Sequence, residues 1–516
     1  MSSTSPSDAL RFHLAYKPQP LKFGTSGRRG KVVDLTQLEI YTNVRAEIRY
    51  LQSLQLSEGG IRKGDDFYFA HDLRPSSTGY VENNRGGLCQ AVVQALKDGG
   101  MNPINLGAIP TPALTFFALQ KAKGSIMVTG SHIPFDRNGY KLNTSKGELL
   151  KKDEQPINNV VEVVREELLS QPFADSLFNE QGMLPAYIQR YLDFFQGESL
   201  KGMKILVYQH SAVGRDVVVE ILEKLGAEAT PAGRSETFVP IDTEAIDEAQ
   251  LSTVQKLYDS TGQSFNAVVS TDGDSDRPLL LAPEGDKLRF FGGDLLGMIV
   301  AEFLQADSVV VPISTNDAID RGALAGALEP KTKIGSPYVI AGMQSAVEKR
   351  RQRVCGWEAN GGFLTGSDIE RNGQVLPALP TRDAVLPLLC ALFAAQSRLM
   401  TLPALFSTLP KRFSRAALIR NFPRATSLKI IDRFSELEGI FSARHGFSSI
   451  SRIDYTDGVR VIFENGDVAH FRPSGNADEL RIYAVADTQE RADQIATEGV
   501  AEPEGLLRRL ERLVQA

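Results

Sequence analysis

A loop that follows a short apolar run carries several groups that could act together chemically. The run from Ser125 to Val128 is typical of a buried strand that delivers a loop to a sheet edge. The thirteen residues after it contain a hydroxyl nucleophile candidate, Ser131, followed by His132, and end at Lys141. A polar surface turn closed by Asn138-Gly139 is the alternative interpretation. The loop alone does not decide between these two interpretations.

Three aspartates at alternating positions follow a second apolar run, Asn266 to Ser270: Asp272, Asp274 and Asp276. Side chains two apart in extended chain point the same way, so these carboxylates could converge on one hard cation. An EF-hand calcium loop is excluded, because its sixth position is Arg277 instead of glycine and its twelfth is Pro283 instead of glutamate. A plain acidic turn remains the alternative. Since every ligand is oxygen, we expect Mg²⁺, with Arg277 suited to a phosphate beside it.

Two glycine-containing loops later in the chain give weaker signals. In the first, Glu358 and Asn360 could bond a polyol, while Trp357, the single tryptophan, is expected in the core. In the second, an arginine fork, a hydroxyl and main-chain amides opened by glycine form a candidate phosphate cradle: Arg472, Ser474, Gly475 and Asn476. Turns of this second kind also occur without ligands.

These groups need elements to position them, and strand–helix units recur along the chain. Strands followed by helices are predicted at 66–70 and 88–96, at 204–208 and 217–225, and at 308–311 and 317–328. Repetition of this unit predicts several α/β domains of related build.

The last hundred residues have a different pattern. Residues 458–463 and 468–471 alternate around Asn465-Gly466, which predicts a hairpin, and 479–484 offers another strand. Helices over 488–498 and 506–514 complete a predicted α+β domain. The expected domains are 1–180, 181–291, 292–405 and 406–516.

Composition and charge exclude several function classes. The net charge of −6 and the pI of about 5.7 provide no basic field for nucleic acid. The three cysteines are far apart and are expected to be reduced thiols in a cytosol. The first residues show neither the basic region nor the apolar core of a signal peptide. The most apolar segment, 384–395, is too short to span a membrane. We therefore expect a cytoplasmic protein.

Taken together and in this order, the four loops resemble the α-D-phosphohexomutase family. The resemblance implies a phosphoserine at Ser131 that is also a metal ligand, an active-site lysine at Lys141, and Arg29 in the cleft, from the motif Phe23 to Gly30. It further implies a four-domain fold around a central cleft, with three related α/β domains with mixed sheets and a C-terminal α+β domain. The remaining site residues that it implies bind Mg²⁺, sugar and phosphate: Asp272, Asp274, Asp276, Glu358, Arg472, Ser474 and Asn476.

The implied reaction is transfer of a phosphoryl group from Ser131 to a hexose phosphate through a hexose 1,6-bisphosphate, with small-molecule hexose phosphates as the only partners expected. His132 either transfers protons or only orients the loop. A sugar-phosphate-binding protein without catalysis and a metal-dependent phosphatase are the alternatives from other classes. Each makes a different prediction for turnover and for phosphate release.

Departures from the family pattern concern the choice of sugar. The family often has serine where this chain has Asn360 and histidine where it has Gly362, some members have histidine at Ser336, and Asn476-Ala477 replaces a common Thr-Glu. The sugar and phosphate loops look most like those of mutases acting on mannose phosphates. Mannose 1-phosphate and mannose 6-phosphate are therefore the expected substrates, with glucose phosphates, or both sugars, as the alternative.

Overall fold

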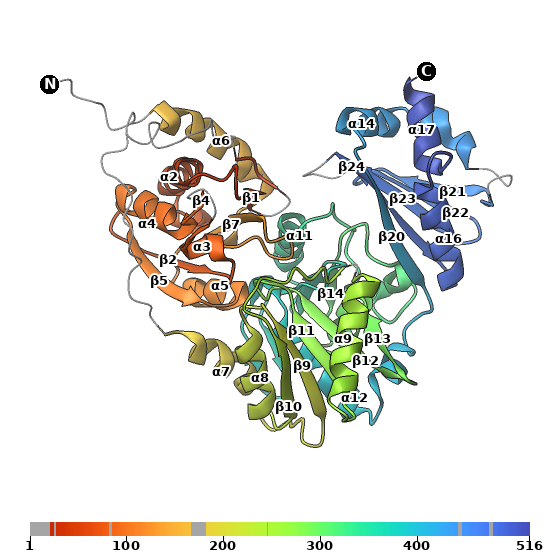
Figure 1. The fold of residues 1–516 in the computed structure, drawn as a ribbon, viewed down its shortest axis with the longest axis horizontal. Helices are drawn as coiled ribbons and strands as arrows, with labels where there is room; N and C mark the ends of the chain where they lie inside the picture. Colours follow the sequence, from red (N-terminus) through yellow and green to blue (C-terminus); the bar gives the residue numbers. More distant parts are fainter. Residues whose placement is uncertain are drawn as a thin grey trace.

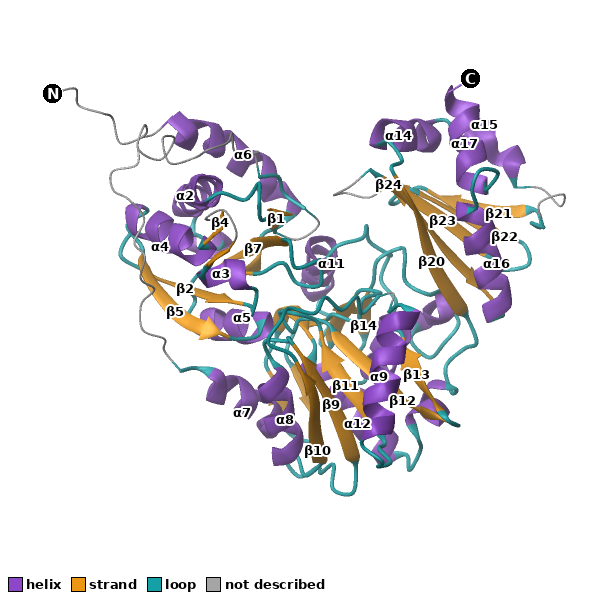
Figure 2. Cartoon of the chain, viewed as in Figure 1, coloured by secondary structure: helices purple, strands orange, loops and turns teal. Residues whose placement is uncertain are grey.

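The computed structural model describes residues 21–24, 27–81, 85–166, 182–244, 246–441, 446–473 and 478–515. Thr25 and Ser26 of the N-terminal motif, and Ser474, Gly475 and Asn476 of the phosphate loop, lie outside the described residues. Four sheets of four to six strands follow one another along the chain (Figures 1 and 2). Each falls within one of the four predicted domain ranges, whose boundaries stay predictions.

The first domain contains a six-stranded mixed sheet of order β1-β7-β6-β2-β5, with β8 paired to β7. Phe67 and Phe69 of β2 pack with helices α2 and α4, whereas Tyr68 and Ala70 belong to the core that includes α5. Because successive side chains of a strand face opposite sides, β2 is apolar on both faces, as a parallel inner strand requires. The elements are β1 (Arg28–Lys31), α2 (Gln37–Ser53), β2 (Asp66–His71), α3 (Pro75–Thr78), β3 (Tyr80–Val81), β4 (Arg85–Gly86), α4 (Leu88–Asp98), β5 (Asn102–Ala108), α5 (Thr111–Gln120), β6 (Ser125–Val128), β7 (Arg137–Thr144), β8 (Gly147–Glu148) and α6 (Lys151–Glu166).

The second domain has a five-stranded sheet of order β10-β9-β11-β12-β13, parallel at β10, β9 and β11 and antiparallel beyond. Ile205 and Val207 of β9 pack with α8, and Leu206 lies in the same cluster as Val254 of α9 on the other face. The elements are α7 (Leu184–Phe194), β9 (Lys204–His210), α8 (Arg215–Lys224), β10 (Glu228–Arg234), α9 (Glu248–Ser260), β11 (Ala267–Thr271), β12 (Pro278–Glu284) and β13 (Lys287–Phe291).

The third domain has a four-stranded mixed sheet of order β14-β15-β16-β19. Its helices α10 and α12 share one continuous apolar cluster with α5 of the first domain and α8 of the second, so the first three domains pack together. Trp357 is fully buried, as expected. The elements are α10 (Gly293–Phe303), β14 (Ser308–Val310), α11 (Ser336–Glu348), β15 (Val354–Trp357), β16 (Phe363–Thr365), β17 (Ile369–Arg371), β18 (Gln374–Leu376), β19 (Leu379–Asp383), α12 (Val385–Ser397) and α13 (Leu402–Phe406).

The fourth domain has its own core and a five-stranded antiparallel sheet of order β20-β24-β23-β22-β21. The predicted hairpin around Asn465-Gly466 is formed by β22 and β23. The elements are β20 (Phe413–Arg420), α14 (Arg424–Asp432), α15 (Phe434–Leu437), β21 (Ile450–Asp454), β22 (Val459–Phe463), β23 (Val468–Pro473), β24 (Glu479–Ala486), α16 (Gln489–Val500) and α17 (Leu506–Gln515). The predicted fold class, three mixed α/β domains followed by an α+β domain, is confirmed.

One local prediction and one alternative interpretation are wrong. Residues 317–328 form two short 3-10 helices, Asp317–Asp320 and Ala325–Ala327, with Gly322 between them, and the two glycines of the segment disfavour a continuous α-helix. The helix of this unit is α11, which begins later at Ser336. Asn138-Gly139 closes no hairpin turn, because both residues lie inside β7 and pair with β1.

The strand pairing explains the glycine at position 139. A Cβ atom there would lie 1.9 Å from the carbonyl oxygen of Arg28, so only glycine lets β1 approach β7. The loop that carries Ser131 is correspondingly shorter than predicted and ends at Asp136, before β7 begins. No helix among the described residues combines the length and the apolar character needed to cross a membrane.

Candidate active site

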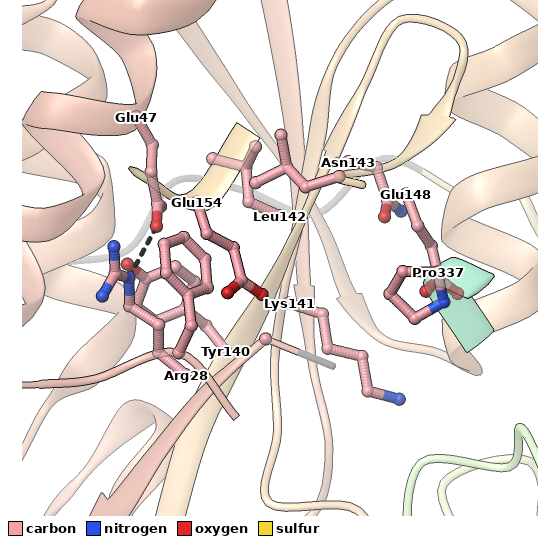
Figure 3. A pocket seen from close by; sticks show the side chains of 12 residues that line it. Arg28, Glu47, Tyr140, Lys141, Leu142, Asn143, Glu148, Glu154 and Pro337 are labelled. Carbon is pink, nitrogen blue, oxygen red and sulfur yellow. Dashed lines mark hydrogen bonds and ion pairs between the residues drawn. The ribbon is translucent and has the colours of Figure 1, made fainter. Parts of the chain in front are cut away.

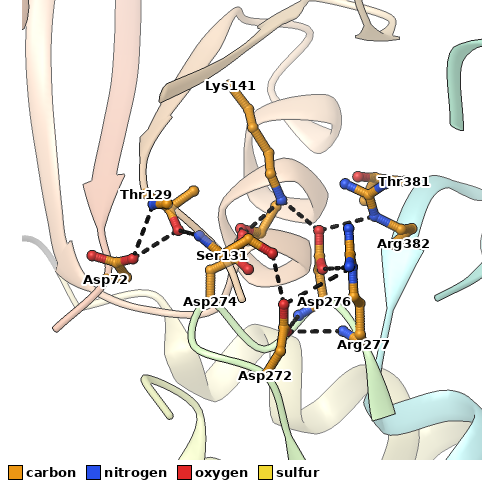
Figure 4. A network of polar contacts seen from close by, with 12 residues as sticks. Asp72, Thr129, Ser131, Lys141, Asp272, Asp274, Asp276, Arg277, Thr381 and Arg382 are labelled. Atoms are coloured by element: carbon orange, nitrogen blue, oxygen red, sulfur yellow. Dashed lines mark hydrogen bonds and ion pairs between the residues drawn. The ribbon is translucent and has the colours of Figure 1, made fainter. Parts of the chain in front are cut away.

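Ser131 lies in the loop between β6 and β7, at the edge of the first sheet that faces the second domain (Figure 4). Its hydroxyl donates to Asp272 Oδ2 at 2.7 Å, and its main-chain N–H donates to Thr129 Oγ1 at 2.7 Å. Ser131 is buried and has a φ of 56°, in the left-handed region that a non-glycine residue rarely adopts. A strained, anchored serine directed at an aspartate of another domain is therefore the centre of the site.

Arg74 holds this loop, and the sequence interpretation did not identify it. Its guanidinium donates to four main-chain oxygens at 2.6–2.8 Å, those of three loop residues and of the first residue of β7: Ser131, Ile133, Pro134 and Arg137. It also stacks on the ring of Phe238 in the second domain, 3.9 Å from the centroid. Arg74 thus connects the shape of the Ser131 loop to the neighbouring domain.

Asp72 neutralises Arg74 and completes the anchor. Its carboxylate accepts from Arg74 Nε at 3.1 Å and from Thr129 Oγ1 at 2.7 Å, and both members of the ion pair are fully buried. Asp72 directly follows β2, the parallel neighbour of β6. Because parallel strands bring their carboxyl ends to one edge, the predicted strand at 66–70 was the signal that could have located it.

The aspartate loop follows β11 and meets the Ser131 loop from the second domain. Asp272 Oδ1 accepts from the main-chain N–H groups of Asp276 and Arg277, which closes the loop around it. Thr111, at the start of α5, donates to Asp274 Oδ2 at 2.6 Å and ties this loop to the first domain. The three predicted carboxylates are brought together and are all buried.

The donor set fits a hard divalent cation. One oxygen from each of Asp272, Asp274 and Asp276 lies within 4.8 Å of the others. Within the described part of the chain, Asp274 Oδ1 and Asp276 Oδ1 are buried without a hydrogen-bond partner. Burial, and then the charges of Asp274 and Asp276, raise the pKa of Asp272 well above its usual range. A bound cation would satisfy the two oxygens and relieve this repulsion.

Removal and return of the metal should therefore change stability. We expect Mg²⁺ added to chelator-treated protein at about 100 times its Kd to raise the free energy of unfolding by about 2.7 kcal/mol. In Asp272→Asn this increment should disappear, while stability without Mg²⁺ should not fall, because asparagine removes one of three repelling charges. Thermal unfolding with and without Mg²⁺ measures both. An unchanged increment in Asp272→Asn would contradict the assignment of this ligand.

Two positively charged residues from different domains, Lys141 and Arg382, neutralise the aspartate loop. Lys141 of β7 donates from Nζ to Asp274 Oδ2 at 2.6 Å and to Asp276 Oδ2 at 2.5 Å (Figure 4). Burial opposes the ionisation of Asp276, but the charges of Arg382 and Lys141 hold its pKa below the usual value. Arg29 of β1 is in the electrostatic field of the same site, and burial, together with Arg277, lowers its pKa to about 10. An anion placed here would meet several positive groups.

His132 is held by Arg277 and is neutral. Arg277 Nη1 lies 2.9 Å from His132 Nδ1, so the ring nitrogen is the acceptor and the ring proton is on Nε2. Burial, followed by the charges of Arg277 and Arg29, lowers the pKa of His132 well below its usual value. The hydroxyl of Ser131 is 3.4 Å from the same Nδ1 atom. This nitrogen is already occupied, which favours positioning over proton transfer.

The third domain reaches the site through Arg382, another residue that the sequence interpretation did not identify. Arg382 of β19 donates to Asp276 Oδ2 at 3.0 Å and to Glu358 Oε2 at 3.0 Å. Burial opposes its charge, yet these two carboxylates raise the pKa of Arg382 well above its usual value. Glu148 of the first domain accepts from Ser336 and Thr381 beside it. The predicted sugar loop, which carries Glu358, is thereby joined to the aspartate loop.

Asn360 holds the predicted sugar loop together by a hydrogen bond within the loop and by one to the second domain. Its Oδ1 atom accepts from the N–H of Gly362 at 3.0 Å, and its main-chain oxygen accepts from Thr243 of the second domain at 2.8 Å. Glu358, in contrast, points its carboxylate at Arg382. Both predicted sugar-loop residues therefore lie at the junction of the second and third domains.

The fourth domain is attached to the third along strand β22. Before this strand, Asp457 Oδ2 accepts from Arg472 Nε at 2.8 Å and from the N–H of Ile334 at 2.9 Å. Within it, Arg460 donates to the oxygen of Ile313. After it, the oxygen of Gly466 accepts from Arg412, which also pairs with Asp317. The phosphate-loop residue Arg472 is thus held toward the third domain.

A small pocket lies beside β7 and is lined in part by Lys141 (Figure 3). Its charged walls include Arg28 and Glu47, whose buried side chains form an ion pair at 2.8 Å. Neither Ser131 nor any of the three aspartates lines it. Its paired charges support β1, the strand that carries Arg29.

Models of four consecutive domains match the chain. They are described as phosphoglucomutase/phosphomannomutase alpha/beta/alpha domains I, II and III, over residues 20–167, 185–285 and 292–413, and the C-terminal domain, over 421–502. The chain belongs to the phosphoglucomutase/phosphomannomutase family. The resemblance predicted from the four loops is confirmed, and with it a mutase.

Relatives in this family cover nearly the whole chain. A phosphomannomutase of Sinorhizobium fredii is 39% identical over 93% of this chain and 98% of its own length. A phosphomannomutase of Salmonella muenchen is also 39% identical, over 92% of this chain and 94% of its own length. Two solved structures of the N-acetylphosphoglucosamine mutase of Aspergillus fumigatus share the fold of this mutase family.

One Aspergillus structure contains glucose 1,6-bisphosphate. It covers 99% of both chains at 16% identity, with a TM-score of 0.60. The other contains GlcNAc-6P and magnesium. It covers 99% of this chain and 100% of that chain at 14% identity, with a TM-score of 0.56.

Proposed function

We propose that the chain interconverts mannose 1-phosphate and mannose 6-phosphate, with Ser131 as the phosphoryl carrier. The observation that carries this proposal is the 2.7 Å bond from Ser131 Oγ to Asp272, in a buried site that combines three carboxylates with a lysine and several arginines. A nucleophile held beside a candidate metal loop and surrounded by cations is suited to phosphoryl transfer, where positioning and electrostatics supply most of the acceleration. The two phosphomannomutase relatives support mannose as the sugar.

Mg²⁺ is the proposed cofactor, and a hexose 1,6-bisphosphate is the proposed intermediate and activator. The ligands of the Mg²⁺ ion would be the phosphorylated Ser131 together with Asp272, Asp274 and Asp276. When bound, the ion supplies positive charge to the oxygens of the transferring phosphoryl group. The magnesium and the bisphosphate in structures of the Aspergillus enzyme support both choices.

The chemical step moves one phosphoryl group and one proton. The bond from phosphorus to Ser131 Oγ breaks, a bond from phosphorus to a hexose hydroxyl oxygen forms, and the proton of that hydroxyl ends on Oγ. Lys141, which bonds two of the metal-loop carboxylates, is the proposed group that relays the proton. After the bisphosphate turns around, the same step in reverse returns its other phosphoryl group to Ser131.

The remaining groups bind and orient the substrate. Arg277 and Arg29 are proposed to hold the reacting phosphate, and His132 to hold Arg277 in place through the bond to Nδ1. Glu358 and Asn360 would bond the ring hydroxyls. The phosphate that does not react would bind in the fourth domain, at the residues of the predicted phosphate loop: Arg472, Ser474, Gly475 and Asn476.

A substrate panel tests the proposal. Mannose, glucose, glucosamine and N-acetylglucosamine 1-phosphates are each converted by the purified protein with Mg²⁺, and the 6-phosphates are measured. We expect the largest kcat/KM with mannose 1-phosphate. Equal values for mannose and glucose would establish dual specificity, and a larger value for glucose would replace mannose as the substrate.

The same panel separates the other classes of function. Release of inorganic phosphate faster than isomerisation would indicate a phosphatase. Binding without turnover, and without phosphate on Ser131 by intact-mass analysis, would indicate a protein that only binds sugar phosphates. Each of these results would overturn the mutase proposal.

A further inference from the structure

The side chain of Arg382 occupies space that a glycine leaves open. Gly362 lies just before β16, and the position that its Cβ atom would take is filled by the side chain of Arg382 on the neighbouring strand β19. A Cβ atom at position 362 would lie 2.4 Å from Arg382 Cδ and 2.6 Å from its Cγ. Real Cβ atoms do not approach carbon this closely, so the stem of the arginine can cross the sugar loop only because residue 362 has no side chain.

The guanidinium reached in this way has one nitrogen without a partner. Nε bonds Asp276, and Nη1 bonds Glu358 at 3.0 Å and lies 3.4 Å from Ser336 Oγ. Among the described residues, Arg382 Nη2 is buried and has no hydrogen-bond partner, and the whole residue is only 2% exposed. A buried donor left unpaired is costly, so the site is complete only when another acceptor is present.

The position of Arg382 indicates what that acceptor is. Its guanidinium bonds Asp276 of the aspartate loop that faces Ser131 (Figure 4), and it also bonds Glu358 of the sugar loop. A ligand oxygen between these loops belongs to the reacting end of the hexose phosphate. Guanidinium groups pair strongly with phosphate oxygens, through several N–H donors in one plane.

We infer that Arg382 is a substrate-binding residue: its Nη2 donates to the phosphoryl group in transfer between Ser131 and the hexose, and Gly362 is the residue that permits this. The inference rests on the proposed function, because it uses the same site. It adds to that function a phosphate contact made by the third domain and a paired requirement at positions 362 and 382.

Arg382→Gln and Glu358→Gln, separately and combined, test the contact. If Arg382 touches the phosphoryl group, Arg382→Gln lowers kcat/KM roughly 10- to 100-fold, and the double variant loses roughly a further 10-fold relative to Glu358→Gln alone. If Arg382 acts only by holding Glu358, the double variant equals Glu358→Gln, and this result would overturn the inference. Arg371→Gln is the control, since Arg371 pairs with Glu198 and stacks on Phe303 at a distance from the site; its kcat/KM should not change.

A second readout does not depend on which hexose is preferred. Dephosphorylated protein is mixed with glucose 1,6-bisphosphate and Mg²⁺, and the phosphorylation of Ser131 is followed by intact-mass spectrometry. The rate should fall roughly 10-fold or more in Arg382→Gln. If the wild type is phosphorylated but isomerises no hexose phosphate, the proposed function fails while this rate still decides the role of Arg382. No phosphorylation of the wild type would overturn both.

Gly362→Ala tests the space argument without changing any charge. The new methyl group must displace the arginine stem, so we expect the Ser131 phosphorylation rate to fall as in Arg382→Gln. In Arg382→Ala only the Cβ atom of the stem remains, 3.0 Å from a Cβ at position 362, so adding Gly362→Ala should cost much less than it does in the wild type. Circular dichroism and thermal unfolding establish that the variants are folded. A fully active Gly362→Ala protein would overturn the paired requirement.

Discussion

Replacement of Ser131 by alanine is expected to lower mutase turnover by at least about 10⁴-fold, because the group that carries the phosphoryl is removed. The fold should survive. The variant loses one hydrogen bond to a buried carboxylate, so the free energy of unfolding should change by no more than about 2 kcal/mol. Initial rates with mannose 1-phosphate and a urea unfolding curve measure the two quantities.

A matched serine provides the control for this variant. Ser211 is also buried in the second domain, and its hydroxyl accepts from the N–H of Val239, outside the site. Ser211→Ala should retain turnover within a few-fold. If intact-mass analysis finds phosphate on the Ser131→Ala protein and turnover persists, the carrier is another residue.

Replacement of Arg74 by methionine is expected to have the largest effect on stability, about 3–5 kcal/mol. The change leaves Asp72 as a buried charge without its cation and removes the donors of four main-chain oxygens around Ser131. The loop would then no longer be held, and turnover should fall as well. Urea unfolding and steady-state kinetics measure these effects.

A double-mutant cycle shows whether the ion pair causes the loss. Asp72→Asn combined with Arg74→Met should cost clearly less than the sum of the two single changes, because no buried charge is then left alone. Arg234→Met is the control, since Arg234 pairs with Asp216 at 2.7 Å on the exposed surface and should cost less than about 1 kcal/mol. Additive losses at Asp72 and Arg74 would show that they do not act as a pair.

The chemistry-bearing loops were predictable because their residues are neighbours in the sequence. Asp272, Asp274 and Asp276 carry their spacing with them, and the apolar run before them indicates the strand that delivers them. Ser131 followed by His132 is visible in the same way. What brings the two loops within 2.7 Å of each other is the packing of the first two domains, which no local pattern encodes.

Arg74 and Arg382 escaped prediction for a different physical reason. Arg74 acts on main-chain oxygens, which every residue has, so its partners leave no signature in residue types. Arg382 bonds Asp276 of the second domain and Glu358 of the third, and its clearest trace in the sequence is an absence, the missing side chain of Gly362. The predicted helix at 317–328 had a visible warning in the sequence, since Gly322 and Gly326 both lower helix propensity.

The attachment of the fourth domain along β22 constrains how that domain can move. Asp457 contacts the third domain just before this strand and Arg460 contacts it from within the strand, while Gly466, after the strand, accepts from Arg412, which pairs with Asp317 of the third domain. Arg321 of the third domain also pairs with Asp487, which follows β24, and both of these side chains are exposed, whereas Arg460 is buried. Any shift of the fourth domain must therefore keep or break contacts on two separate elements, β22 and the end of β24.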